Sequence, residues 1–206
     1  MSGPRILADV RAARAAAEAD IRATLLTAAA TVLSEEGPSA LTTRRLAEAV
    51  NASTKVIYTH FGGKEGLLDA LYLHAFYSLM QAFDTHADEL DPLARLRRMT
   101  ATYRSFALAE PALYNVMFGD LGRAWEAPLA SRRKAWQSFE TLRETVSQCL
   151  ASERRSEALR VTYLIWAAMH GVVSLELRKL IGGSQNSAQL FRQAATAICK
   201  AHDIPY

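Results

Sequence analysis

The sequence predicts an all-α protein in which a three-helix unit of helix-turn-helix type precedes a larger helical bundle. Apolar residues recur at helical spacing along nearly the whole chain, and no segment shows the sustained alternation of a half-buried strand. Glycine, proline and asparagine interrupt this pattern where helices are expected to end, as at Gly37-Pro38 and Gly182-Gly183. With 206 residues and a 50% hydrophobic composition, the chain can bury the core of a small domain joined to a larger one.

The first amphipathic helix should run from about Asp20 to Glu36 and end at Gly37-Pro38. Its inward residues should be Ile21, Leu25, Ala29, Val32 and Leu33. Residues 2–19 are mostly alanine, arginine and acids, so they either extend this helix or fray as an N-terminal extension.

Two short helices joined by a tight turn should follow between Leu41 and Lys64. Thr42 precedes the periodic apolar residues Leu46 and Ala47, so its hydroxyl can accept a hydrogen bond from the first helical turn. Asn51 tolerates a left-handed backbone and can end that helix. Ser53 can cap the second helix. This pattern predicts a helix-turn-helix.

The second short helix has one apolar and one polar face. Val56, Ile57 and Phe61 can point inward, which leaves outward the donors Thr54, Lys55, Tyr58, Thr59 and His60. The net charge of the chain is only +3, but between residues 39 and 64 four basic side chains stand against one acid, Glu48. A basic surface with hydroxyl, amine and imidazole donors suits DNA phosphates and base edges.

These residues resemble the DNA-binding domain of TetR-family transcriptional regulators. The matching pattern is Thr42-Thr43-Arg44, Leu46-Ala47, Ile57-Tyr58, His60-Phe61, and Lys64 before Leu67-Leu68. The family usually has glycine where Asn51 stands and a bulkier residue where Gly66 stands; a helical glycine costs about 1 kcal/mol relative to alanine. The resemblance implies that DNA is contacted by Thr43, Arg44, Thr54, Lys55, Tyr58, Thr59, His60 and Lys64.

Some of these assignments have alternatives. Arg44 and Arg45 are adjacent, so they point about 100° apart and only one can face the duplex squarely. The resemblance selects Arg44, which leaves Arg45 as a solvated surface residue. His60 stands beside Phe61 and either contacts a phosphate or supports local packing. Gly62-Gly63-Lys64 should open the next helix, where the positive helix end can hold one phosphate.

Further helices should begin at Lys64, Pro92, Pro111 and Pro128, the last ending near Leu150. The helix from Lys64 carries a wide apolar stripe and should connect the two units. Ser156 can cap a long helix to about Ile181, and the final helix should run from Ser187 to about His202. We therefore expect an N-terminal extension at 1–19, a helix-turn-helix domain at 20–66 and a ligand-binding and dimerisation domain at 67–206.

The second half of the chain is rich in aromatic residues. Most aromatic stripes at helical spacing are ordinary core. Here, however, Trp166-x-x-x-His170-Gly171 resembles a signature of one C-terminal TetR subgroup, as do Tyr103-x-x-Phe106-Ala107 and Pro111-x-Leu113-Tyr114. Trp166 and His170 are on one helix face and can line one cavity. The candidate ligand residues are Tyr103, Phe106, Tyr114, Phe118, Tyr163, Trp166, Met169 and His170.

The last two helices also offer apolar faces for a partner. An isologous four-helix seam would use Val161, Ile165, Ala168, Val172, Leu175, Phe191, Ala195 and Ile198. We therefore expect a homodimer.

Enzyme motifs are missing from the sequence. It contains no Gly-x-Ser-x-Gly elbow, no His-Glu-x-x-His pair, no Cys-x-x-Cys pair and no phosphate-binding glycine loop, and we expect no catalytic residue, metal or cofactor. Cys149 and Cys199 are far apart among apolar residues, which favours buried free thiols. The longest apolar stretch, Tyr163–Leu175, is shorter than the roughly 20 residues that span a bilayer, and no signal peptide is apparent, so we expect a cytoplasmic protein with no membrane segment.

The resemblance implies a homodimeric DNA-binding regulator, in most cases a repressor, that binds an inverted-repeat operator. A small apolar or aromatic effector would release it from DNA. Two alternatives stay open at this point: a helical ligand-binding protein without DNA recognition, and an effector-independent DNA binder.

Overall fold

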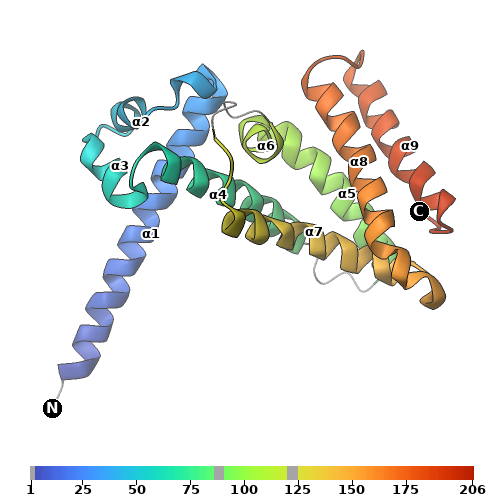
Figure 1. Ribbon diagram of the computed structural model, residues 1–206, viewed down its shortest axis with the longest axis horizontal. Helices are drawn as coiled ribbons and strands as arrows, with labels where there is room; N and C mark the ends of the chain where they lie inside the picture. Colours follow the sequence, from blue (N-terminus) through green and yellow to red (C-terminus); the bar gives the residue numbers. More distant parts are fainter. Residues whose placement is uncertain (1–2, 86–90, 120–124) are drawn as a thin grey trace.

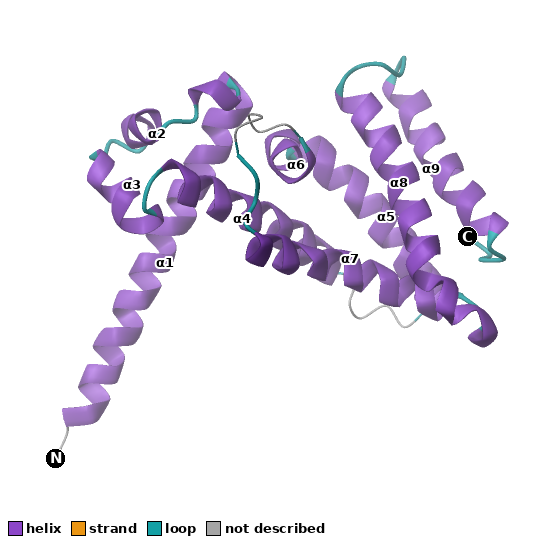
Figure 2. Ribbon diagram, in the orientation of Figure 1, coloured by secondary structure: helices purple, strands orange, loops and turns teal. Residues whose placement is uncertain are grey.

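The computed structural model describes residues 3–85, 91–119 and 125–206. Within these ranges every regular element is a helix (Figure 2). The α-helices are α1 (Gly3–Glu36), α2 (Thr43–Ala49), α3 (Thr54–Phe61), α4 (Lys64–Asp84), α5 (Pro92–Ala109), α6 (Pro111–Phe118), α7 (Leu129–Cys149), α8 (Ala158–Leu177) and α9 (Ser184–Ala201). Short 3₁₀ turns at Pro38–Ala40 and Ser152–Glu157 precede α2 and α8. The predicted all-α architecture is confirmed.

The small N-terminal unit consists of α2 and α3 packed against α1 and the start of α4 (Figure 1). The Thr42 side chain accepts a hydrogen bond of 3.0 Å from the Arg45 amide, so the expected cap is present. Asn51 ends α2 with a φ of 51°, the left-handed conformation expected of it. Ser53 occupies the N-cap position of α3, but its side chain makes no capping hydrogen bond.

Helix α1 begins at Gly3, well before the expected Asp20, and its first turns extend away from the rest of the molecule (Figure 1). Residues 9–20 are exposed, and continuous packing starts with Leu25 and Leu26. Ile21 was expected to point inward, but 43% of its surface is exposed, because at this turn of α1 the side chain of Arg22, not that of Ile21, faces α3. Alanine-rich sequence is sufficient for the helix to continue without a partner.

Helix α4 joins the two units. Its first half buries Leu67, Leu68 and Leu71 against α1 and α3, and its second half buries Leu79 and Phe83 against the bundle. The same helix therefore packs on both units, as the width of its apolar stripe predicted.

The bundle contains α5 to α9, with α8 and α9 side by side at one end (Figure 1). Asp91 caps α5 by accepting hydrogen bonds of 3.2 Å from the amides of Leu93 and Ala94. The prediction for α8 was inaccurate at both ends. Ser156 belongs to a 3₁₀ turn instead of capping the helix, and Glu157 occupies the N-cap position. The helix ends at Leu177 because Lys179 adopts a left-handed conformation with a φ of 58°.

One segment of the described chain, Ser152–Leu177, is long and apolar enough to cross a membrane by length and composition, since an 18-residue stretch within it has a mean hydropathy of 1.3. Such a helix is also typical of a soluble core, and here it packs along α9 and against α5 and α7. Its Val161, Thr162 and Ile165 are fully covered within the protein.

Both cysteines are free thiols, as predicted. Cys199 is buried and Cys149 is half-buried. Burial raises the pKa of Cys149 to about 11 and the pKa of Cys199 to about 12. Both side chains are therefore protonated near neutral pH and behave as small apolar groups.

Candidate nucleic-acid interface and ligand cavity

The outward face of α3 presents a continuous polar surface. Thr54, Lys55, Tyr58 and Thr59 are all exposed, and Tyr58 exposes 56% of its surface. The Thr59 hydroxyl donates to the Lys55 carbonyl at 2.8 Å, so its proton is already engaged and it is poorly placed to donate to a phosphate. His60 is half-buried at the end of the helix. The surface therefore offers Thr54, Lys55 and Tyr58 as its freest side chains.

The two adjacent arginines of α2 have different partners. Arg45 reaches back to Glu36 of α1, with Nε 3.0 Å from both carboxylate oxygens. Arg44 pairs only with Glu48, one turn along the same helix, and 85% of its side chain is exposed. An exposed pair of this kind holds a side chain weakly. Arg44 is consequently the more available of the two for a phosphate, and Thr43 is half-buried beside it.

Arg22 fixes the end of α3 to α1, a role that the sequence did not reveal. Its guanidinium donates to the carbonyl of His60 and lies 4.6 Å from the centre of the Phe61 ring. A cation near the C-terminal carbonyls of a helix is favourable, and the aromatic face adds a further attraction. Arg22 and His60 are 38 positions apart, so no local spacing pattern signals this contact.

A glycine-rich turn places Lys64 at the start of α4. Gly62 and Gly63 have φ values of 73° and 130°, which side-chain-bearing residues rarely adopt. Lys64 is exposed beside the free amides of the first helical turn. At Gly66 an added Cβ would come within 1.8 Å of the Phe61 carbonyl oxygen. The expected penalty of glycine relative to alanine is thus reversed here, because alanine would push α4 away from α3.

A partly open cavity of about 250 Å³ lies between α4, α5, α6, α7 and α8. Its lining is almost entirely apolar and aromatic, with Arg132 and Ser138 as the polar exceptions beside the tyrosine hydroxyls. The lining residues are Tyr72, Phe76, Leu79, Phe83, Tyr103, Met117, Phe118, Arg132, Ala135, Trp136, Ser138, Phe139, Leu142 and Trp166.

The candidate ligand residues fall into three groups. Tyr103, Phe118 and Trp166 line the cavity. Tyr114 and His170 lie directly behind them, with the His170 ring 5.0 Å from Phe118 between centroids. Three others lie elsewhere: Phe106 borders a shallow groove with Ala82 and Arg98, Met169 is in the core, and Tyr163 is at the exposed edge of α8 against Phe139. These three residues belong to helices that border the cavity, but they are on other faces of those helices.

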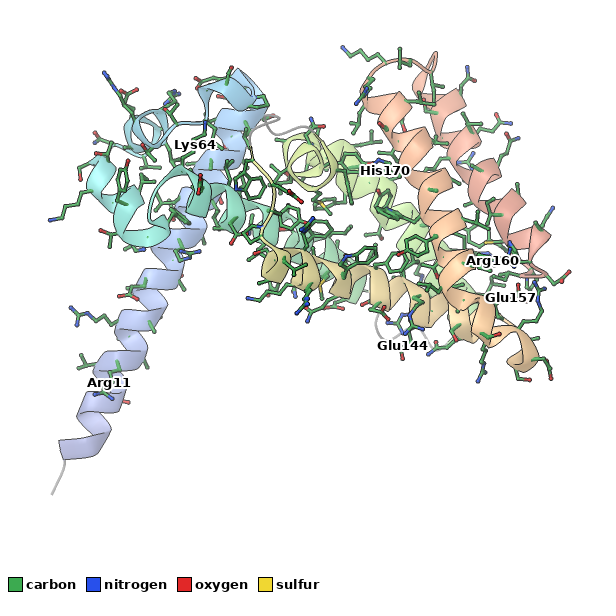
Figure 3. All side chains as sticks on the ribbon, viewed as in Figure 1. Arg11, Lys64, Glu144, Glu157, Arg160 and His170 are labelled. Atoms are coloured by element: carbon green, nitrogen blue, oxygen red, sulfur yellow. The ribbon has the colours of Figure 1, made fainter. Side chains whose placement is uncertain are left out.

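A chain of hydrogen bonds runs behind the cavity wall. Trp166 Nε1 donates to the Tyr103 hydroxyl at 3.3 Å, Tyr103 donates to the Tyr114 hydroxyl at 3.3 Å, and Tyr114 lies 2.6 Å from His170 Nδ1. The side chain of His170, a residue of α8, faces the helices α5 and α6 (Figure 3). Burial lowers the pKa of His170 and raises the pKa of Tyr114 to about 12. Each group is therefore held neutral, with Nδ1 as the acceptor at the end of the chain.

Sequence reasoning missed the cavity walls formed by α4 and α7. Tyr72, Phe76, Leu79 and Phe83 recur every three or four residues along α4, and α7 contributes a similar stripe that begins with Arg132. This spacing is visible in the sequence, but ordinary core helices show it equally. Only the packing of the two helices leaves a cavity between them.

The structure places most of the predicted seam residues inside the protomer. Val161, Ile165, Val172, Phe191 and Ala195 are buried between α8, α9 and the remaining bundle, so they are unavailable to a partner. Leu175 is exposed, and Ala168 and Ile198 are half-exposed. The error is again one of helical phase, since the most apolar face of α8 packs inward. No group of three or more histidine, cysteine or acidic residues suited to a metal occurs in the part of the chain that the structure describes.

Comparison with protein families gives two matches that together cover most of the chain. Residues 25–71 match the family described as bacterial regulatory proteins, tetR family. Residues 96–198 match the tetracyclin repressor-like, C-terminal domain.

Individual relatives and solved structures agree with these matches. The nucleoid occlusion factor SlmA of Vibrio vulnificus (strain YJ016) is 30% identical over 125 residues, which span 60% of this chain and 63% of that protein. The structure of putative regulatory protein SCO4313 superimposes with a TM-score of 0.76 at 23% identity, covering 89% of this chain and 97% of that one. PfmR, a TetR family transcriptional regulator from Thermus thermophilus, gives 0.65 at 20% identity, with 85% and 97% covered.

Proposed function

We propose that this chain, which belongs to the TetR family of DNA-binding transcriptional regulators, is a homodimeric repressor released from a palindromic operator by a small apolar or aromatic effector. Members of this family bind DNA and are not enzymes, so its activity is regulatory. A bacterial regulator of this kind meets its operator in the cytoplasm, and we assign the protein to that compartment.

DNA recognition is assigned to α2, α3 and the start of α4. Thr54 and Lys55 lie at the exposed beginning of α3, where side chains can reach base edges in the major groove. Arg44, Tyr58 and Lys64 surround them and suit phosphate contacts, with Thr43 and His60 at the border. These exposed side chains favour a DNA binder over a ligand-binding protein that has lost DNA recognition.

Dimerisation is assigned to the exposed face of α8 together with α9. On α8 this face carries Leu164, Ala167, Gly171 and Leu175, at the spacing of one helical stripe. A Cβ added to Gly171 would meet nothing within 4 Å in the protomer. A second helix can therefore approach closely there, and two copies related by a two-fold axis would form a four-helix seam.

The observation that carries the effector proposal is the position of α4. This helix begins at Lys64, directly after the turn that ends α3, and from Tyr72 onward it forms a wall of the cavity, through Tyr72, Phe76 and Leu79. A molecule that fills the cavity must act on the helix that holds the DNA-binding surface. It shifts the operator equilibrium only by the difference between its affinities for the two arrangements.

The experiment has two stages. Duplexes of random sequence are selected for binding, and an inverted repeat is expected among those retained. Apolar and aromatic compounds are then screened for release of the selected operator. Trp166→Ala should abolish release while leaving operator affinity nearly unchanged, provided that circular dichroism shows a folded protein. If the Trp166→Ala protein releases the operator at the same ligand concentration as the parent protein, the cavity assignment is wrong.

A further inference from the structure

The cavity has one charged side chain among the described residues that line it, Arg132 at the start of α7. The remaining lining is aromatic or aliphatic apart from Ser138 and the hydroxyls of Tyr72 and Tyr103. An ionised side chain at an apolar cavity is costly unless it has a partner. The ionic partner of Arg132 therefore decides which ligands the cavity can bind.

In this structure the partner of Arg132 is Glu126, in the segment before α7. The Arg132 Nη1 atom lies 2.6 Å from the Glu126 carboxylate. The arginine side chain is 46% exposed and the glutamate 78% exposed. An ion pair so open to water contributes little to stability, so Glu126 can be replaced at low cost.

The arginine is at the rim of the cavity, with part of its side chain in water and part facing the lining. Its charge acts on Tyr72, where it lowers the pKa against the stronger upward effect of burial. Beyond Arg132 the lining is mostly aromatic and includes Trp136, Phe139, Trp166 and Phe118. The site therefore combines one charged side chain at its rim with a largely aromatic lining.

We propose that the effector is an amphipathic carboxylate whose apolar or aromatic body fills the cavity and whose carboxylate replaces Glu126 on Arg132. This inference rests on the proposed function, because it names the chemical class of the same effector. A carboxylate is favoured because Arg132 already binds one: its Nη1 atom donates a hydrogen bond of 2.6 Å to the Glu126 carboxylate. Arg132 was not among the candidate ligand residues that the sequence indicated.

The test compares two ligands that differ only in charge, 4-phenylbutanoate and 4-phenylbutanamide. Binding to the full chain without DNA is measured by calorimetry and by the fluorescence of Trp136 and Trp166, which line the cavity. The acid should bind about threefold to tenfold more tightly than the amide to the parent. Octanoate and octanamide repeat the comparison with an aliphatic body.

Three variants test whether Arg132 and Glu126 determine the preference for the acid over the amide. Arg132→Gln should remove the preference for the acid, and Arg132→Lys should retain part of it. Glu126→Gln removes the competing carboxylate, so it should strengthen binding of the acid and leave the amide unchanged. Arg133→Gln is the matched control, because it loses the same charge at an exposed neighbour outside the cavity lining. It should behave as the parent does.

The outcomes separate this inference from the function on which it rests. Equal affinity of the parent for acid and amide, or an undiminished preference in folded Arg132→Gln, would overturn the carboxylate inference while leaving an apolar effector site intact. If neither compound of either pair binds, while a different uncharged compound does release the operator, the carboxylate inference alone fails. If no compound binds or releases the operator, both fail together.

Discussion

The hydroxyl of Tyr114 on α6 lies 2.6 Å from Nδ1 of His170 on α8, which joins two helices behind the aromatic cavity. The two rings are also stacked, with centroids 5.6 Å apart and planes inclined by 24°. Since Tyr103 and Trp166 continue the hydrogen-bond chain to the cavity lining, this contact both stabilises the bundle and fixes the shape of the cavity.

Removal of the Tyr114 hydroxyl should destabilise the protein. Tyr114→Phe removes the 2.6 Å contact of His170 Nδ1 and leaves that nitrogen with the Tyr103 hydroxyl at 3.3 Å, and the loss of one hydrogen bond costs about 0.5–1.5 kcal/mol. For a chain of this length the Tm should fall by roughly 1–6 °C. Tyr77→Phe is the control, because Tyr77 is 59% exposed and should tolerate the change. Similar melting temperatures for both variants would contradict the role given to this contact.

The neutral state of His170 should make stability depend on pH. Burial lowers its pKa in the folded protein, while the unfolded chain binds a proton near pH 6.5. The stability due to a neutral His170 is therefore complete above about pH 6.5 and is lost as the pH falls toward the lower folded-state pKa. The Tm should drop between about pH 7.5 and about pH 5.5, and His170→Gln should reduce that drop. His74, whose pKa is also lowered by burial, accounts for a remaining decrease of the same sign.

Lys64 and Arg45 should differ in their effect on DNA binding. Lys64→Ala should weaken binding to all sequences and reduce the slope of log affinity against log salt by about 1, because one phosphate contact is lost. Arg45→Ala removes the same charge from a side chain already paired with Glu36, so its slope should match the parent's. Titrations at several salt concentrations measure both slopes. Identical slopes for Lys64→Ala and the parent would refute the phosphate contact.

Thr54 and Lys55 should instead control sequence preference. Both side chains are exposed at the N-terminal end of α3, where base edges are within reach. Substitution of either residue by alanine should change which duplexes are selected from a random pool, with losses of about 1–3 kcal/mol confined to particular base pairs. A uniform loss across all duplexes would mean that these side chains contact only phosphates.

A charge on the exposed face of α8 should dissociate the dimer. Gly171→Glu and Leu164→Glu place a carboxylate where the protomer leaves open space or exposed surface, so folding is retained, yet an unpaired charge in an apolar seam costs several kcal/mol. Light scattering should report a monomer, and binding to a palindrome should weaken with it. Val10→Glu, on the exposed N-terminal part of α1, should remain a dimer. Dimers for both α8 variants would place the seam elsewhere.

The sequence alone determined the elements that depend on local chemistry. Thr42 caps α2, Asn51 ends it in a left-handed conformation, and Pro92 begins α5, because each effect acts over a few neighbouring residues. The polar face of α3 could also be predicted from the sequence, since a short helix between Asn51 and Gly62 can bury only one side. The resemblance of these same residues to TetR regulators led to the family that the comparisons confirm.

Only the tertiary structure decided which face of each long helix turns inward. An α8 that is apolar on most sides gives no preferred phase in the sequence, so Val161, Ile165 and Val172 were assigned to a partner although they pack against this chain's own helices. For the same reason, Phe106 and Met169 were predicted to line the cavity although they do not. Tyr72, Phe76 and Arg132 do line it but were not predicted. Burial and cavities are set by several helices at once, and the contacts of Arg22 with α3 and of Tyr114 with His170 join residues far apart in the chain.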